Sequence, residues 1–322
     1  MTAITHKKIS FVIPVYNEAA GIVDFHNSIE KVIEPILPNY ELIYVDDGSQ
    51  DNCLKSIAEL AVKNKNIRLI SLSRNFGKEN ALSAGIHNAD GEAVMMLDGD
   101  GQHPVELIPE FIQSWLNGNK VVVGVRTAYT NEKFVKRAGS YLFYKSFNKM
   151  SGKKLIPGTS DFRIIDKTVS EAFKQLKDSD RVTRGLIDWL GFKTSYIKFR
   201  AKSRQHGQAG YSFNKLVKLA MNSYVGFSTT PLYFFGYLGI VISSLSFILG
   251  LAVFIEQLLI GDPLHWKFTG TAMLGILIIF LVGILLMAQG ILSVYVSMIH
   301  NQSKQRPLYV IDYENSIGLD QK

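Results

Sequence analysis

Short apolar segments alternate with amphipathic segments through the first 125 residues of the chain. The apolar runs have the length of buried strands and lie at 9–15, 40–45, 67–72, 93–97 and 120–125. Helical spacing of apolar residues follows each of the first four runs, at about 20–34, from Ser49 or Asp51 to Lys63, and at 78–88 and 104–117. This alternation predicts βαβ units, an α/β fold and a mostly parallel sheet with right-handed crossovers.

The regular alternation ends after Arg126. The pattern then predicts a helix at 130–150, a turn feeding a strand at 158–165, a helix at 179–190, a strand at 194–199, a polar loop at 202–212 and an amphipathic helix at 213–228. Aromatic and basic residues are interleaved in the first of these helices. Lys215 and Lys218 lie on the polar side of the last one.

Two long uncharged runs follow, at 232–255 and 268–299. About 20 apolar residues cross a bilayer core as a helix, so each run is long enough. The pattern predicts a membrane hairpin of two helices at about 232–255 and 272–296. We therefore expect a catalytic domain at 1–210, an interfacial amphipathic helix at 211–230, the hairpin within 231–300 and a tail at 301–322.

Charge refines this organisation. The chain has 322 residues, of which 47% are hydrophobic, and a net charge of +7, which favours an acidic partner such as lipid headgroups, phosphates or nucleic acid. Lysine and arginine residues lie before the first run and after the second. The connecting segment 256–267 has only Lys267, against the acids Glu256 and Asp262. This asymmetry predicts a multi-pass plasma-membrane protein whose catalytic domain and both termini are cytoplasmic. The single cysteine, Cys53, excludes an internal disulfide framework and a cysteine-based zinc site.

Acidic residues stand where predicted strands end. The run at 93–97 stops at Asp98-Gly99-Asp100, Asp46 and Asp47 end the second strand, and Glu18 follows the first. The carboxyl ends of parallel strands meet at one edge of a sheet, where such folds bind ligands. Carboxylates there suit Mg²⁺ or Mn²⁺, which complete their coordination with water and substrate phosphates. The alternative is that these acids serve as turn and helix-capping residues.

Other sites can be tested against the same residues. A calcium loop starting at Asp98 would need glycine at its sixth position and glutamate at its twelfth, where the chain has His103 and Pro109. A Gly-x-Gly-x-x-Gly motif after the first strand and a Gly-Lys-Ser/Thr phosphate loop are both absent from the sequence. A dinucleotide-binding fold and an ATPase are therefore disfavoured.

Four motifs together resemble glycosyltransferase family 2, and in particular its polyprenyl-phosphate glycosyltransferases, relatives of dolichol-phosphate mannose synthase and the bactoprenol glucosyltransferases. The motifs are Pro14-Val15-Tyr16-Asn17-Glu18, Val45-Asp46-Asp47-Gly48-Ser49, Ser73-Arg74-Asn75-Phe76-Gly77-Lys78 and Asp98-Gly99-Asp100-Gly101-Gln102-His103-Pro104. The resemblance covers about residues 8–228, and the expected two-helix tail matches the bacterial branch. It implies a GT-A fold and an inverting transfer from a nucleotide sugar to a lipid phosphate.

The resemblance also implies roles for single residues. Pro14, Tyr16 and Glu18 would line the nucleotide pocket, and Asp46 would contact the base. Asp98 would meet the ribose or diphosphate, Asp100 would hold the metal together with Asp98, and Gln102 would lie near the diphosphate. Asp161 matches the position of the catalytic base, and Arg163, Arg204 and Lys215 are candidate contacts to the acceptor phosphate.

Two of these roles are open to alternatives. Near Arg204 the family has a Ser-Lys pair where this chain has Ala209-Gly210, so Arg200, Lys202 or Lys215 are substitutes for that lysine. These basic residues could instead serve only to attract anionic lipid, at about 1 kcal/mol each. A phosphate monoester has a second pKa of about 6 and hardly needs a base at pH 7. We therefore expect Asp161 chiefly to orient the acceptor or the sugar.

The sequence thus predicts transfer of a hexose from a UDP-sugar to undecaprenyl or another polyprenyl phosphate, for modification of a cell-surface glycan. Glucose is the first candidate sugar and N-acetylglucosamine the second. The expected partners are the donor, the lipid phosphate, the bilayer and a possible second copy of the chain, but not nucleic acid. A processive polysaccharide synthase is disfavoured because the Gln-x-x-Arg-Trp motif is absent. An inactive membrane scaffold is disfavoured because Asp98, Asp100 and Asp161 are present.

Overall fold

The computed structural model describes residues 3–127, 158–178, 181–200, 241–242, 244–245, 248 and 270–319. The chain divides into two compact units, which we describe separately. The first comprises Met1–Ser140, Ile156–Ala209 and Arg306–Lys322, and the second comprises Tyr141–Leu155 and Gly210–Gln305. The predicted helices at 130–150 and 213–228, the loop at 202–212 and most of the first apolar run lie outside the described residues.

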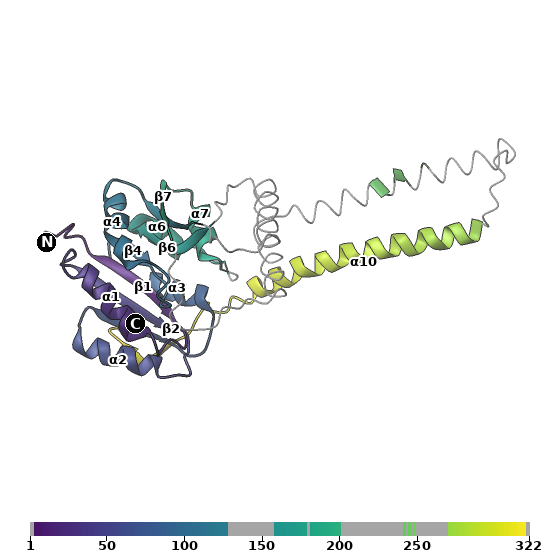
Figure 1. The fold of residues 1–322 in the computed structure, drawn as a ribbon. Helices are drawn as coiled ribbons and strands as arrows, with labels where there is room; N and C mark the ends of the chain where they lie inside the picture. Colours follow the sequence, from purple (N-terminus) through teal and green to yellow (C-terminus); the bar gives the residue numbers. More distant parts are fainter. Residues whose placement is uncertain are drawn as a thin grey trace. The chain divides into compact units, whose positions relative to one another are not determined.

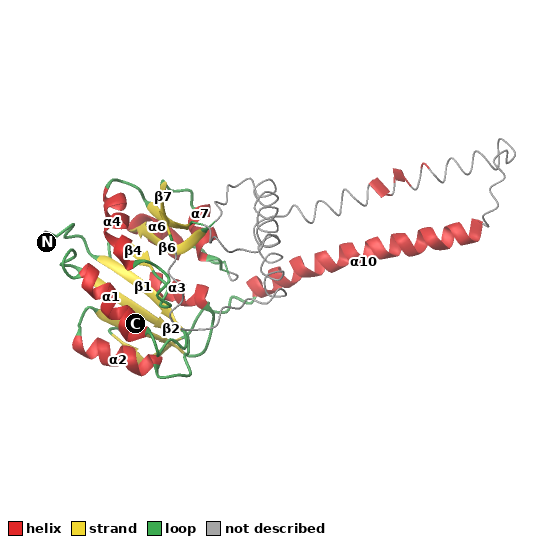
Figure 2. Cartoon of the chain, in the orientation of Figure 1, coloured by secondary structure: helices red, strands yellow, loops and turns green. Residues whose placement is uncertain are grey.

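The first unit is a sheet with helices on both faces (Figure 1, Figure 2). Its strands are β1 (Ile9–Val15), β2 (Tyr40–Asp46), β3 (Ile67–Leu72), β4 (Ala93–Met96), β5 (Val121–Arg126), β6 (Thr159–Asp166), β7 (Thr194–Phe199) and β8 (Ile311–Ile317). Its helices are α1 (Ile22–Ile33), α2 (Cys53–Lys63), α3 (Lys78–His87), the 3₁₀ turn η1 (Val105–Leu107), α4 (Ile108–Leu116), α6 (Lys167–Lys174) and α7 (Thr183–Trp189). The predicted α/β fold is confirmed.

Two apolar cores lie on the two faces of the sheet. One joins the strands to the buried sides of α1, α2 and α4, and the other joins them to α3, α6 and α7. Every residue of β1, β2 and β4 is buried, as expected for strands covered on both faces. This burial explains why the sequence shows continuous apolar runs here rather than alternation.

The described strands form one sheet in the order β7-β5-β6-β4-β1-β2-β3-β8. The pairs β1–β2, β2–β3, β1–β4 and β5–β7 are parallel, whereas β6 runs antiparallel to both β4 and β5. The strand order reverses between β1 and β4, so their carboxyl ends border the crevice in which α/β sheets bind ligands. Because β6 is antiparallel, its first residues lie at this same edge.

Two elements were not foreseen by the sequence pattern. The segment expected as a tail contributes β8, which pairs antiparallel with β3 through Leu69 and Ile317. Its end is held by Arg68, whose Nε donates to the Gly318 carbonyl at 3.0 Å. Helix α6 begins directly after β6, where Asp166 caps it by accepting from the backbone N–H of Thr168.

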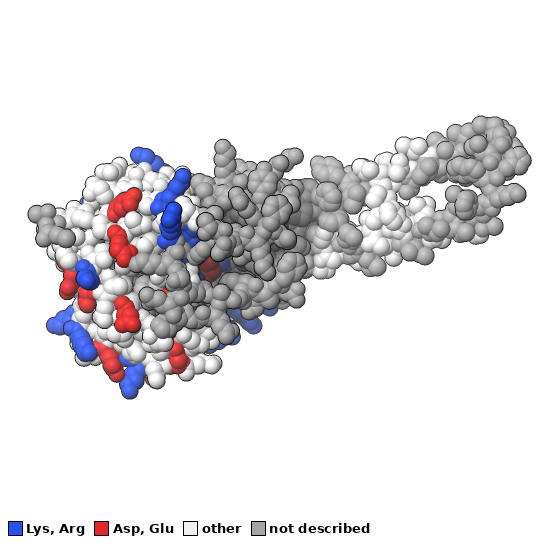
Figure 3. All heavy atoms as spheres, in the orientation of Figure 1, with Lys and Arg blue, Asp and Glu red and all other residues white. Residues whose placement is uncertain are grey.

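The second unit contributes the long helix α10 (Gly270–Ser303). The window Phe280–Ser297 has a mean hydropathy of 2.0 and no buried residue, so among the described residues one helix is long and apolar enough to cross a membrane. Its described surface carries no charge (Figure 3). In the first apolar run, residues 241–242, 244–245 and 248 are helical and the others lie outside the description. The two-helix hairpin therefore stays a prediction.

Candidate active site

The loops after β1 and β2 are locked together. Asn17, at φ 55°, donates its backbone N–H to Ser49 Oγ at 2.9 Å, and its Oδ1 accepts from the N–H of Gln50 at 2.8 Å. Asp51 Oδ2 accepts from the N–H of Ala19 at 3.0 Å. Asparagine tolerates the left-handed backbone region better than most residues. The Tyr16-Asn17-Glu18 motif is therefore held at a fixed place against the Asp46–Ser49 motif.

Three nucleotide-pocket residues predicted from the motifs flank this junction. Pro14 lies in β1 two residues past Val12, the last to pair with β4, so its missing N–H breaks no β1–β4 bond. Tyr16 is 42% exposed. Glu18 lines a cavity of about 330 Å³ between α1 and the Gly99–Glu106 turn, and Asp100 lines it as well. The structure thus brings Glu18 and Asp100 to one cavity.

The neighbouring acids Asp46 and Asp47 are both buried but have different partners. Asp47 accepts from the N–H groups of Phe76 and Gly77, at 2.7 and 2.9 Å. Asp46 Oδ2 accepts from the N–H of Ser49 at 3.1 Å, whereas its buried Oδ1 has no hydrogen-bond partner in the described part of the chain. Burial raises the pKa of Asp46, an effect that these hydrogen bonds only partly oppose. Asp46 therefore presents an unsatisfied acceptor.

His103 shapes the turn that carries Asp98 and Asp100. Its ring is buried and stacks on Phe162 with 5.1 Å between centroids, and its Nδ1 accepts from the backbone N–H of Asp98 at 3.1 Å. Burial lowers the pKa of His103, so the ring is neutral with its proton on Nε2. Asp100 Oδ1 accepts from the backbone N–H of Gln102 at 3.1 Å. Packing of His103 on Phe162 in β6 thus holds the turn that carries both carboxylates.

Lys78 joins Asp98 to Asp161. Its Nζ lies 2.5 Å from Asp98 Oδ1 and 2.7 Å from Asp161 Oδ2. Burial opposes the charge of the ammonium, but the two carboxylates outweigh it and raise the pKa of Lys78. Burial likewise opposes ionisation of Asp161, yet Lys78 lowers the pKa of this carboxyl to about 2. The two acids predicted for the donor and acceptor sides therefore lie on either side of one cation.

Asp98 and Asp100 are the two residues that could hold a metal at this turn. Among the described residues no three or more His, Cys, Asp or Glu side chains cluster to hold an ion. Magnesium commonly binds through one or two carboxylates and the phosphates of its substrate rather than an all-protein cage. Two carboxylates separated by one residue on a packed turn fit such a metal–diphosphate site. Two carboxylates are too few to hold a structural ion by protein side chains alone.

The three predicted contacts to the acceptor phosphate have different outcomes. Arg163 is 1% exposed, and its guanidinium contacts the Ser160 carbonyl at 3.1 Å and Asp188 Oδ1 at 3.4 Å. Its predicted phosphate contact is not supported, because a buried guanidinium engaged in this way holds β6 to α7. Arg204 and Lys215 lie outside the described residues.

Sequence reasoning assigned no role to two basic residues at this edge. Lys78 ends the motif at 73–78 and is predicted to start a helix. An ammonium at the start of a helix is unfavourable without acidic partners, so this position could have indicated acids nearby. Arg126 ends β5 beside the turn, with a terminal nitrogen 3.5 Å from His103 Nε2. Its buried Nε has no partner in the described residues. Nothing in the local sequence marks Arg126, because the antiparallel β6 brings it there.

A protein family and several known proteins are similar to this chain. The family described as Glycosyl transferase family 2 matches residues 10–173. The chain is 36% identical over 304 residues to an uncharacterized glycosyltransferase of Synechocystis sp., with 94% of each chain covered. It is 34% identical over 307 residues to the bactoprenol glucosyl transferase of Shigella phage SfV, covering 95% of this chain and 99% of the relative. Among solved structures, the glucosyl-3-phosphoglycerate synthase of Mycobacterium tuberculosis is 17% identical, with a TM-score of 0.49 and coverage of 70% of this chain and 83% of that chain.

Proposed function

Because the chain belongs to glycosyltransferase family 2, and is a glycosyltransferase with the GT-A type of α/β fold, we propose that it transfers a hexose from a UDP-sugar to a polyprenyl phosphate. The proposed acceptor is undecaprenyl phosphate, and glucose is the first candidate sugar. The relative from Shigella phage SfV, which is matched over nearly its full length, is named for glucosyl transfer to bactoprenol and supports both choices. N-acetylglucosamine remains the second candidate.

The donor would lie across the carboxyl ends of β1, β2 and β4. The unsatisfied Oδ1 of Asp46 is a suitable acceptor for an N–H of the nucleotide base. Pro14 and Tyr16 border the same junction, and Glu18 and Asp100 line the adjoining cavity. This arrangement supports the nucleotide-binding roles that the motifs imply.

Departure of a nucleoside diphosphate leaves negative charge that must be stabilised in the transition state. A Mg²⁺ or Mn²⁺ ion held by Asp98 and Asp100 would supply that charge stabilisation when bound. The packed turn that carries the two acids keeps them in place before the donor arrives. Gln102, at the end of this turn, is the proposed neighbour of the diphosphate.

The observation that carries the proposal is the meeting of Asp98 and Asp161 at one edge of the sheet. Asp98 belongs to the donor side, and Asp161 is the third residue of the antiparallel strand β6 on the other side of the crevice. The acceptor phosphate is largely ionised at pH 7. Asp161 would therefore orient the acceptor or the sugar, and the inverting attack comes from a phosphate oxygen that needs little deprotonation.

A lipid acceptor would explain why the chain has a long apolar helix. Its isoprenoid chain lies in the bilayer, so a catalytic unit anchored by α10 meets the phosphate at the membrane surface. The proposed location is the cytoplasmic face of the plasma membrane, where the product would serve modification of a cell-surface glycan.

The test uses the purified full chain in detergent with undecaprenyl phosphate, Mn²⁺ or Mg²⁺, and a panel of radiolabelled UDP-sugars. Label is followed into the organic phase. We expect one sugar to enter the lipid, Asp100→Ala to abolish the transfer and Asp90→Ala to leave it intact. Asp90 is a suitable control because it pairs with Arg68 at the opposite edge of the sheet. Label that remains in water for every donor would refute the lipid acceptor and favour a polymer synthase or a scaffold.

A further inference from the structure

Lys78 occupies an unusual position in the fold. It is the first residue of α3 and follows Gly77, whose φ of 94° is left-handed backbone. The Lys78 side chain is 43% exposed, whereas those of Asp98 and Asp161 are 17% and 16% exposed. The side chain is therefore partly exposed along its length, while its ammonium is held by two largely buried carboxylates.

The position is costly for the helix itself. The first turn of a helix carries a partial positive charge, so a cation there is disfavoured by roughly 0.3–1 kcal/mol. The N-cap residue of α3 is Gly77, which has no side chain to cap the helix. A residue chosen for helix stability at this place would be neutral or acidic. The presence of lysine points to the two carboxylates as the reason for its choice.

A third acid, Asp47, fixes the backbone next to this lysine. Asp47 accepts from the N–H groups of Phe76 and Gly77, the two residues before Lys78. On the other side, Glu79 Oε2 accepts from the N–H of Thr183 at 2.8 Å, which ties the same turn to α7. The ammonium thus reaches Asp98 and Asp161 from a backbone fixed at two points.

We propose that Lys78 is a positioning residue that holds the carboxylate of Asp161 in place against Asp98 and so aligns the acceptor side of the site with the donor side. This inference rests on the proposed function and names the residue that assembles its site. Without the ammonium, the carboxylates of Asp98 and Asp161 would face each other and separate, because like charges held close together repel. Displacement of a catalytic group by about 1 Å costs roughly 100-fold in rate.

The experiment compares Lys78→Met, Asp161→Asn and the double variant in the full chain. If Lys78 acts through Asp161, each single change lowers kcat about 100-fold, and the double change lowers it no further. The donor KM and the affinity for UDP measured by calorimetry stay within about threefold of wild type. Additive losses, approaching 10⁴-fold, or a loss of UDP binding in Lys78→Met would overturn the proposal, since Lys78 would then act on the donor.

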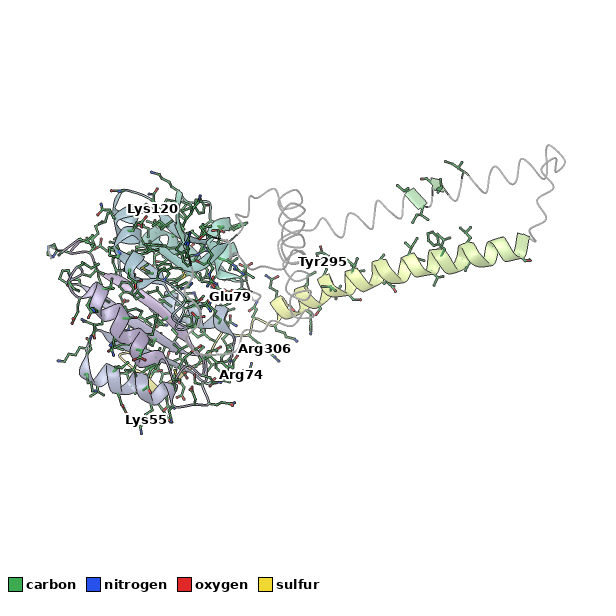
Figure 4. The ribbon with its side chains drawn as sticks, viewed as in Figure 1. Lys55, Arg74, Glu79, Lys120, Tyr295 and Arg306 are labelled. Atoms are coloured by element: carbon green, nitrogen blue, oxygen red, sulfur yellow. The ribbon has the colours of Figure 1, made fainter. Side chains whose placement is uncertain are left out.

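Two control variants separate this role from general stability. Lys78→Arg keeps a cation between the two acids and is expected to recover kcat to within about tenfold of wild type. Lys120→Met removes another lysine whose side chain is 43% exposed and whose Nζ pairs with an aspartate, Asp166, at 3.0 Å. Lys120 lies well away from Glu79, the neighbour of Lys78, in Figure 4. We expect kcat to be unchanged in Lys120→Met.

The unfolding temperature gives a readout that needs no activity. Lys78→Met is expected to lower it by exposing the two carboxylates to each other, and adding Asp161→Asn is expected to raise it again by removing one of these charges. If the effects of the two substitutions on the unfolding temperature simply add, the proposed link between Asp98 and Asp161 through Lys78 is refuted, even in active protein. A wild-type protein that transfers no sugar, yet shows this recovery, would refute the proposed lipid acceptor and leave the link supported.

Discussion

Neighbouring residues with the same side chain serve different purposes in this site. Asp46 and Asp47 are consecutive and both buried, yet Asp47 accepts two backbone N–H groups while Asp46 keeps an acceptor without a partner. A satisfied buried carboxylate stabilises the fold, whereas an unsatisfied one costs free energy unless a ligand completes it. From the sequence, both residues were predicted only as acids at the end of the second strand, because spacing alone does not reveal hydrogen-bond partners.

The contrast predicts opposite effects of two conservative changes. Asp47→Asn keeps one oxygen acceptor but places an amide N–H₂ against the backbone N–H of either Phe76 or Gly77. It is expected to lower the free energy of unfolding by about 2 kcal/mol, since one hydrogen bond to a charged group is lost and two donors then face each other. Chemical denaturation of the full chain in detergent measures the change.

The paired variant is Asp46→Asn. We expect it to leave the free energy of unfolding within about 0.5 kcal/mol of wild type while weakening UDP binding about tenfold. Calorimetry measures that affinity. If Asp47→Asn weakened UDP binding as much as Asp46→Asn does, with no loss of stability, the assignment of the two roles would be wrong.

His87 predicts a pH dependence of stability. Burial, together with Arg181 and Lys174, lowers the pKa of His87 from 6.5 to about 4, while the Tyr309 hydroxyl lies 2.9 Å from its Nδ1. Between these two pH values the unfolded chain binds the proton and the folded chain does not. Stability contributed by this residue is therefore complete above pH 6.5 and falls as the pH drops toward 4.

The measurement compares wild type with His87→Gln by denaturation at several pH values. The difference between the two proteins separates the contribution of the partly buried His87 from those of the buried histidines, His26 and His103. The wild-type curve is expected to be steeper between pH 4 and 6.5, by at most about 1.4 kcal/mol per pH unit for one proton. Parallel curves would show that the ring is already protonated in the folded protein.

At the scale of elements, the sequence predicts most of the parallel half of the sheet. The five expected strands up to Arg126 match β1 to β5, because strands covered on both faces leave continuous apolar runs that periodicity detects. Strand β6 was expected, but its antiparallel direction was not. That direction brings Asp161 opposite Asp98, so pairing partners, and not local sequence, determine the site.

Strand β8 was missed for a different physical reason. Its residues, Ile311 to Ile317, include four polar or charged positions in the middle and present no apolar run. Its stability comes from pairing with β3, which is about 240 residues away in sequence and leaves no local pattern. Edge strands of this kind are commonly polar, because an exposed apolar edge would promote aggregation.

Pairing at this edge leads to a prediction for β8. Ile317 is partly buried against the core that includes α1 and α2, and Tyr313 is 44% exposed. Ile317→Asp is expected to lower the free energy of unfolding by about 2 kcal/mol, since it buries a charge in an apolar contact. Tyr313→Asp in the same strand is the control, with an expected change within about 0.5 kcal/mol. Equal effects in denaturation experiments would argue that β8 is not docked through Ile317.

At the scale of the whole molecule, charged residues and the long apolar helix occupy different parts of the chain. Basic and acidic side chains are interspersed over the visible face of the catalytic unit, whereas α10 has none (Figure 3). Directly after α10 come Lys304 and Arg306, and Arg306 already belongs to the catalytic unit. The end of the helix is thus tied by chain connectivity to the unit that carries the site, which should lie on the same side of a membrane.

This connectivity predicts opposite accessibility for the two ends of α10. The helix has 34 residues, about 51 Å at 1.5 Å per residue, which exceeds a bilayer core of about 30 Å. With Lys304 and Arg306 inside, Gly270→Cys is expected to react with a membrane-impermeant maleimide in intact cells, and Gln305→Cys only after lysis. Wild type is the control, because burial raises the pKa of its one thiol, Cys53, to about 12 and leaves it unreactive. Labelling of Gln305→Cys in intact cells would place the catalytic unit outside, away from any cytoplasmic nucleotide sugar.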